Sequence, residues 1–527
     1  MSHALSRRGF LSLAGAAGVA GALGIAGCAP SPGSSSPSPT LGSGSAKPAL
    51  SGVSNTILPL AQPERWKEVL SAVNAKMLEE IGVTLNAQFY PWSNFAQQSL
   101  LKFTTGEKFD SGLQALWLNL AQLVADGALV DLTDLIPKYP NLTATVDKAL
   151  FDANAWSGTT WGIPQVNTMG RLHHIRIRQD LAEKHGIGEL ASYDDFERYM
   201  YLIKEKESGM VPFFAANGTA WILAIPRPTA IFDANSWEDP SRIPLSYGGK
   251  GFWFFPAKDA VSTGSTSLTP YWEDPAVVET FRRIRKYYQD GIINADAITV
   301  DNATVTSQFI AGRYASSWAV TDGQSSSVIN DMRKAIPGAA LASYVPFRDG
   351  LNAKPYQTFQ ADNLVVVNAK GGDPERTLAI QDWLSIKENH DLLAYGIEGT
   401  DWEAVGTDRI NPLSKYSFPG YGLLWRQGLW RKPTTMSETE DAIFTWSQQP
   451  ESFTVDPYAA FKADNAEVEA EVAAMIEVQT EFGNPLYYGT VDVDEQLDKL
   501  KRAADKVGLD KLISTLETQA NTHLAQA

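Results

Sequence analysis

The residues that could carry out catalysis or hold a metal are few and scattered. The six His residues form no His-x-x-His, His-Glu-x-x-His or Cys/His ligand set, which argues against a zinc or iron site. The sequence also lacks a Gly-x-Ser-x-Gly elbow, a Gly-x-x-x-x-Gly-Lys phosphate loop and a twelve-residue calcium loop. These patterns predict no metal and no cofactor, and they favour a binding protein over an enzyme.

Paired carboxylates are harder to dismiss, because two acids far apart in sequence can meet in the fold and hydrolyse a glycosidic bond. Glu398, Asp401 and Glu403 stand in the aromatic stretch of residues 396–403. Solvated or structural carboxylates are the simpler interpretation. An exported carbohydrate-active enzyme stays the alternative to a binding protein.

Aromatic residues are the most informative group, with 15 Trp, 18 Tyr and 22 Phe. Flat rings stack well on the apolar faces of sugars at low entropic cost, although many of these residues will form the core. The net charge of −16 argues against nucleic-acid binding and, less strongly, against an anionic ligand. A protein that binds a peptide or an amino acid is a further alternative, which the aromatic content favours less than a sugar binder.

The N-terminus predicts export. Arg7 and Arg8 precede an apolar, Gly/Ala-rich run that ends in Ile-Ala-Gly-Cys28. The start resembles a twin-arginine signal and the end resembles a bacterial lipobox. We therefore expect residues 1–27 to be a signal peptide. Cys28 is the one cysteine of the sequence, and we expect it to be lipidated. Residues 28–50 are rich in Ser, Pro and Gly, so we expect them to be a disordered tether. The body would then lie at the outer face of the cell membrane.

The body alternates short apolar strands with amphipathic helices, which predicts an α/β fold. A helix over residues 64–81, a strand over 83–90, a helix over 93–103 and a strand over 112–117 suggest a parallel βαβ unit. Further along, the patterns predict a buried strand and three helical regions. These are a helix over 274–288, a strand over 363–368, a helix that begins at Asp373-Pro374, and helices over 494–525.

Several phrases resemble the extracellular solute-binding proteins of carbohydrate ABC importers, and in particular a large lipoprotein branch that includes aldouronate- and alginate-oligosaccharide-binding members. They lie at residues 126–135, 160–164, 177–181, 192–196 and 393–399. The last, Leu-Ala-Tyr-Gly-Ile-Glu-Gly, is the most specific. Trp161 departs from the pattern, since the family usually has Tyr there.

The resemblance implies a two-lobed periplasmic-binding-protein-like fold of type II, with hinge crossovers. By analogy, residues 51–166 and 319–386 would form lobe I, and residues 167–318 and 387–527 would form lobe II. The lobes would close on a carbohydrate, which the protein would deliver to the permease subunits of an ABC importer. We expect a monomer that carries out no covalent chemistry.

The candidate ligand-binding residues follow from strand ends and crossovers, since ligands bind beyond the carboxyl ends of parallel strands. Trp92 follows the first strand, and Trp117 and Asn119 follow the second. Amide side chains at the expected hinge would bond hydroxyl groups, and an arginine there would hold the carboxylate of a uronate. The remaining candidates are Gln165, Asn167, Arg171, Trp253, Trp318, Tyr356 and Trp402.

Overall fold

The computed structural model of the chain divides into two units, Met1–Pro48 and Ala49–Ala527. The residues that it describes are 50–526, apart from residues 157, 171–172, 191, 216–240, 242, 248–251, 301, 321–325, 346–349, 358, 360, 362 and 460. Within this part of the chain, no helix is both long and apolar enough to span a bilayer.

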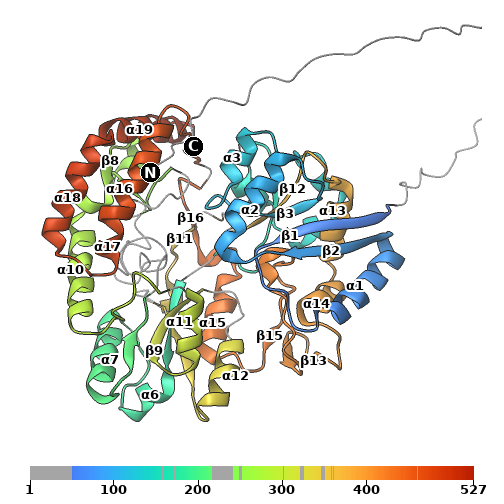
Figure 1. Cartoon of the computed structure of the whole chain (residues 1–527), viewed down its shortest axis with the longest axis horizontal. Coiled ribbons are helices and arrows are strands. Elements are labelled where there is room, and N and C mark those ends of the chain that lie inside the picture. The colour runs from blue at the N-terminus through green and yellow to red at the C-terminus, as the bar shows by residue number, and fades with distance from the viewer. Residues whose placement is uncertain are drawn as a thin grey trace, which may run out of the picture. The chain divides into compact units, whose positions relative to one another are not determined.

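The first half of the body is built on a five-stranded sheet in the order β2-β1-β3-β12-β4. The central strand β1 runs parallel to both β2 and β3, and β12 runs antiparallel to β3 and β4. The strands are β1 (Gly52–Leu58), β2 (Val83–Phe89), β3 (Ser111–Gln114), β4 (Gly162–Pro164) and β12 (Leu364–Val367). Figure 1 shows β1 and β2 in blue beside the orange helices α13 and α14, which come from much later in the sequence.

Helices cover the sheet through two apolar cores. One core contains α1, α13 and α14, and the other contains α2 and α3. The predicted spacing along α1 is confirmed, because Trp66, Val69, Val73 and Met77 are all buried. These helices are α1 (Trp66–Ile81), α2 (Trp92–Thr105), α3 (Leu120–Ala125), α13 (Pro374–Trp383) and α14 (Lys387–Tyr395), with the short α4 (Pro140–Thr145) and α5 (Lys148–Asn154) nearby.

A second sheet has the order β10-β5-β9-β6, in which β9 runs antiparallel to β5 and parallel to β6. Its strands are β5 (His173–Arg178), β6 (Val211–Phe213), β9 (Tyr314–Val320) and β10 (Leu341–Tyr344). The helices that follow or flank them are α6 (Gln179–Lys184), α7 (Tyr193–Lys206), α11 (Asn302–Ile310) and α12 (Ser326–Ala335).

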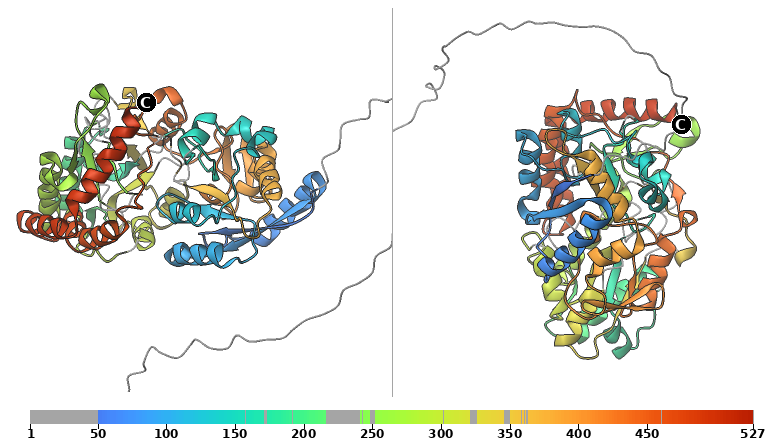
Figure 2. Two further views of the ribbon diagram at one scale, coloured as in Figure 1. Left: turned by 90° about the horizontal axis from the view of Figure 1, so that it is seen from above. Right: turned by 90° about the vertical axis from the view of Figure 1, so that its right-hand side faces the viewer.

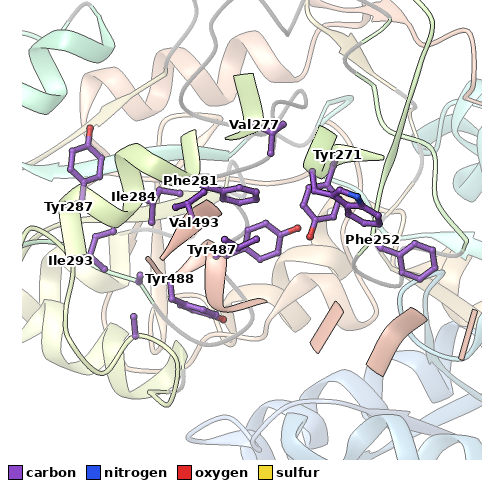
Figure 3. Packing of buried hydrophobic residues seen from close by; sticks show 14 of the residues in the cluster. Phe252, Tyr271, Val277, Phe281, Ile284, Tyr287, Ile293, Tyr487, Tyr488 and Val493 are labelled. Carbon is purple, nitrogen blue, oxygen red and sulfur yellow. The ribbon is translucent and has the colours of Figure 1, made fainter. Parts of the chain in front are cut away.

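The largest core joins this second sheet to the C-terminal helices, which are red in Figures 1 and 2. Figure 3 shows Phe281 of α10 beside Tyr487, with ring centroids 5.5 Å apart, and Tyr271 close to both. The elements concerned are β7 (Phe254–Pro256), α9 (Ala260–Thr263), β8 (Leu268–Pro270), α10 (Pro275–Gln289), α16 (Glu469–Val478), α17 (Asn484–Tyr487), α18 (Val493–Lys506) and α19 (Leu509–Leu524). The carboxylate of Asp274 caps α10, as its place before Pro275 predicts.

The expected lobe boundaries differ from this packing in two places. β10 pairs with β5, so residues 341–344 lie with the second sheet, and α12 packs on α11 there. Residues 387–446 lie mostly with the first sheet, because their apolar side chains fill its core. This segment contains a small sheet of β13 (Trp402–Val405), β14 (Arg409–Pro412) and β15 (Lys432–Pro433), the turn η5 (Gly420–Gly422) and helix α15 (Glu438–Ser447). We use lobe I for the residues around the five-stranded sheet and lobe II for those around the four-stranded sheet.

In the described part of the chain, the connections between the lobes include residues 165–170, 350–355 and 447–458. The backbone N–H of Met169 donates to the carbonyl of Ser447 at 2.8 Å. The short strands β11 (Tyr356–Gln357) and β16 (Thr454–Val455) run parallel beside each other. These crossovers are therefore bonded to one another.

Candidate functional site

Three aromatic rings from distant parts of lobe I meet at its surface. The rings of Trp92 and Trp117 lie 5.7 Å apart with a tilt of 32°, and those of Trp92 and Tyr421 lie 5.8 Å apart with a tilt of 33°. The indole N–H of Trp92 also donates to the hydroxyl of Tyr421 at 3.2 Å. We call Trp92, Trp117 and Tyr421 the aromatic platform.

The platform is open to solvent, since 44% of Trp92 and 46% of Trp117 are exposed. Large aromatic side chains usually lie mostly buried, so two adjacent exposed indoles make this surface a candidate binding surface. The rings are already in direct contact. A sugar would therefore lie on the outer surface of the platform and not between Trp92 and Trp117.

The fold explains why these rings meet. β2 and β3 both run parallel to β1, so their carboxyl ends lie at the same edge of the sheet. Trp92 opens α2 directly after β2, and Trp117 lies in the turn after β3. Tyr421 reaches the same edge from η5, more than 300 residues later. The sequence predicted the first two residues from strand ends but missed Tyr421, whose one local signal is an aromatic ring between two glycines.

Asn119, the other predicted residue at this edge, forms hydrogen bonds with α2, the helix that carries Trp92. Its side-chain amide donates to the carbonyl of Ala96 at 2.8 Å and to the hydroxyl of Ser99 at 3.3 Å. The amide of Gln114, at the end of β3, donates to the same hydroxyl at 3.1 Å. These bonds tie α2 to β3 beneath Trp92 and Trp117.

Gln165 and Asn167 are both buried at the start of the first crossover. Gln165 accepts a hydrogen bond from Arg426 at 3.3 Å and donates to Gln381 at 3.3 Å. Arg426 is fully buried and also donates to Gln381 at 2.6 Å. Burial lowers the pKa of the Arg426 guanidinium to about 9. In this conformation the amide of Gln165 belongs to an internal polar network.

Trp402 and Asp401 are also used internally. The Trp402 ring is 4% exposed and its indole N–H donates to the carbonyl of Gly396 at 3.0 Å. Asp401 accepts from Arg65 at 2.6 Å, from Ser414 at 2.7 Å and from the backbone of Ile397 at 3.0 Å. Burial acts to raise the pKa of Asp401, but these hydrogen bonds bring it below its usual value. A carboxylate so firmly held as an anion suits a structural role better than general acid catalysis.

The remaining predicted residues either lie away from the aromatic platform or belong to parts of the chain that the structure does not describe. Trp253 is half-buried against the core of lobe II, and Tyr356 is half-buried in β11. Trp318 is part of β9, opposite Ile175 of β5. Arg171 and Cys28 lie outside the described residues. Trp253, Trp318, Tyr356 and Arg171 stay predictions as ligand contacts, and Cys28 stays a prediction as the lipidated residue.

A separate hollow of about 610 Å³ lies over α15. It contains none of the predicted residues, and ion pairs between Lys432 and Asp441 and between Arg409 and Asp441 cross its floor. Its lining is Leu351, Lys432, Glu438, Asp441, Ala442, Thr445, Trp446, Gln449 and Ser452. Among the described residues, no group of three or more His, Cys, Asp and Glu side chains is placed to hold a metal ion.

Solved structures share this fold over most of its length. The N-glycan transport solute binding protein NgtS from Streptococcus pneumoniae matches with a TM-score of 0.70 and 20% identity, over 90% of this chain and 99% of that one. The same protein in complex with Man1GlcNAc matches with a TM-score of 0.69. The predicted type II fold is confirmed.

Two relatives extend the comparison to sequence. A carbohydrate ABC transporter substrate-binding protein of Streptococcus pneumoniae serotype 4 is 24% identical, over 88% of this chain and 89% of its own length. Lipoprotein LipO of Bacillus subtilis is 22% identical, over 67% of this chain and 69% of its own length. The chain is similar to solute-binding proteins over most of its length. Residues 457–525, which begin just after β16, also match a domain of unknown function, DUF3502. Both relatives are described as binding proteins or lipoproteins and not as enzymes, in agreement with the prediction.

Proposed function

We propose that the protein captures an oligosaccharide outside the cytoplasmic membrane and hands it to an ABC importer. The observation that carries this proposal is the aromatic platform. Exposed indoles that are fixed by a hydrogen bond and by the packing beneath them suit the apolar face of a sugar ring. The description of the pneumococcal relative as a carbohydrate ABC transporter component, and the NgtS complex with Man1GlcNAc, support the same ligand class.

Delivery requires two states that the importer can distinguish. In a two-lobed binder, a ligand that touches both lobes stabilises the closed state by its differential affinity. The bonded crossovers around β11 and β16 are the hinge that we propose for this motion. Gln165, Asn167, Trp318 and Tyr356 lie on or beside these crossovers or on the strands that they connect, so we propose them as contacts made on closure.

The location of the protein is a further part of the proposal. We propose that Cys28 carries lipid and that residues 28–50 tether the body to the outer face of the membrane. The lipobox-like sequence before Cys28 and the likeness to a protein called a lipoprotein support this anchor.

Thermal unfolding of the full-length protein against oligosaccharides, peptides and amino acids tests the proposal. A ligand at a hundred times its Kd that binds only the folded state stabilises the protein by about 2.7 kcal/mol. We expect a shift with an oligosaccharide, and recovery of that sugar uncleaved. A cleaved product would favour the exported enzyme, and shifts with peptides alone would favour a peptide-binding lipoprotein.

A further inference from the structure

We propose that the sugar unit held on the aromatic platform is uncharged, so that the protein takes neutral oligosaccharides and discriminates against uronates. This inference rests on the proposed function and specifies its ligand. It follows from the absence of charged residues in the three segments that carry the platform rings. Residues 81–101, 111–125 and 416–425 carry Trp92, Trp117 and Tyr421, and none of these segments contains Asp, Glu, Lys or Arg, although 20% of the whole chain is charged.

Two of the charged residues that flank these segments are buried and occupied elsewhere. Asp110, just before β3, is 4% exposed and accepts from the backbone of Asn55 at 2.8 Å. Arg426, five residues after Tyr421, is fully buried in the network with Gln381. Neither charge faces the solvent beside the platform.

Both flanking lysines have an acidic partner, in a mostly buried position for Lys102 and in an exposed pair for Lys415. Lys102 lies ten residues after Trp92 on α2, about 15 Å farther along the helix axis at 1.5 Å per residue. Its ammonium pairs with Glu107 and lies over the ring of Tyr90. Lys415 lies 3.6 Å from Glu64.

What the segments do offer is neutral hydrogen bonding. Asn94 and Gln97 are exposed on the first turns of α2, just after Trp92. An amide both donates and accepts hydrogen bonds, as a sugar hydroxyl does, so such groups pair with a neutral sugar without leaving a charge unmatched.

A uronate on the same surface would meet an electrostatic penalty. Its carboxylate would lose water against the rings, which is costly unless a cation or several donors replace that water. Proteins usually supply a bidentate Arg for this purpose. The net charge of −16 adds a field that disfavours anions in general.

Matched pairs of sugars test the inference. We would titrate the full-length protein with manno-, gluco- and galacto-oligosaccharides and with oligouronates of the same configuration and length, which differ from them only at C6. The expected result is that a neutral sugar binds at least tenfold more tightly than its uronate partner. Its Kd should also change less than about twofold between about 20 and about 500 mM NaCl, because screening acts only on charged partners.

A variant of the aromatic platform tests whether the sugar binds there. Trp117→Ala should weaken binding of the neutral sugar at least tenfold, whereas Leu101→Ala, another exposed apolar residue of lobe I, should leave it unchanged. Retained affinity in Trp117→Ala would overturn the inference, because the sugar would then lie elsewhere.

The two proposals fail in different ways. Tighter, salt-sensitive binding of a uronate would overturn the neutral-sugar inference and leave the carbohydrate-binding function standing, with Arg171 as the first residue to substitute. No binding of any sugar, together with binding of a peptide, would overturn both.

Discussion

At the scale of single residues, Trp92 is the centre of the proposed site. It contacts Trp117 and Tyr421 and carries the hydrogen bond that joins η5 to α2. Trp92→Ala should weaken oligosaccharide binding by tenfold or more, since burying a large apolar side chain contributes about 1.5–3 kcal/mol. Isothermal titration measures the change. Leu101→Ala on the same helix is the matched control, and equal loss in both variants would point to a general disturbance of α2.

Tyr421 acts through Trp92, so its role is positioning. Tyr421→Phe keeps the ring but removes the hydroxyl that accepts from the Trp92 indole at 3.2 Å. We expect a loss of affinity of a few-fold, because the Trp92 ring is held less firmly, and a loss of stability of no more than about 0.5–1.5 kcal/mol, the contribution of one neutral hydrogen bond. A lower midpoint with unchanged affinity would instead make Tyr421 a packing residue.

The positions of residues that directly follow strands were predictable from the sequence, whereas long-range contacts were not. Trp92 and Trp117 were predictable because each comes directly after an apolar strand. Tyr421 was not, because no local pattern shows that residues 416–425 fold back against α2. For the same reason the burial of Gln165 beside Arg426, 261 residues away, could not be seen from the crossover motif alone.

At the scale of elements, the helices were predictable from local chemistry. Gly82 ends α1 with a φ of 73°, which Gly adopts without strain, and Asp373 caps α13. β1 was missed as a strand because it begins at the edge of the Ser-rich tether. The lobe assignment of β10 depends on its pairing with β5, from which it is separated by more than 160 residues. Periodicity along the chain says nothing about such a pairing.

The close contact between two crossovers at Gly170 predicts how a substitution there changes the stability of the protein. A Cβ at Gly170 would lie 2.3 Å from the ring of Phe453, which is itself packed on Trp446. Gly170→Ala should therefore force two crossovers apart and destabilise the protein by about 1–3 kcal/mol. Chemical denaturation measures this. Gly188→Ala, where nothing lies within 4 Å of the added Cβ, should change little, and equal stabilities of the two variants would contradict the close contact.

Asp456, which directly follows β16, should make the free energy of unfolding depend on pH. Burial raises the pKa of Asp456 to about 6, against the backbone N–H of Tyr458 and the facing Lys462, which lower it. Burial likewise lowers the pKa of Lys462 to about 8. His523 of α19 lies on the same side, bonded to the carbonyl of Pro457.

Because the folded-state pKa of Asp456 is raised, the folded protein holds this proton more tightly than the unfolded chain. Its contribution to stability is fully present below about pH 4 and is lost as the pH rises through about 6. Asp456→Asn keeps the acceptor for Tyr458, so relative to wild type it should gain up to about 3 kcal/mol between pH 4 and 7, at 1.36 kcal/mol per pKa unit. Denaturation at both pH values measures the gain. Asp464→Asn is the control, since Asp464 makes the same bond two residues ahead but is exposed, and an equal gain there would contradict the role of burial.

At the scale of the whole molecule, we propose that lipid on Cys28 holds the protein at a membrane. Among the described residues, no helix is suited to span one, and a net charge of −16 gives no attraction to an anionic lipid surface. Acyl chains on Cys28 would supply the attachment, at about 0.8 kcal/mol for each buried CH₂ group.

Cys28→Ser should therefore move the protein from the membrane fraction to the soluble fraction, while its affinity for oligosaccharide stays the same. Fractionation after a high-salt wash, with mass spectrometry of the N-terminal peptide, measures both location and lipid. Ser31→Ala, three residues farther along the tether, is the matched control and should remain with the membrane. If the Cys28→Ser protein also remained there, an attachment other than lipid would have to hold a strongly acidic body against a surface that repels it. If it left the membrane but lost affinity, the N-terminal segment would have a part in ligand capture that the platform on lobe I does not require.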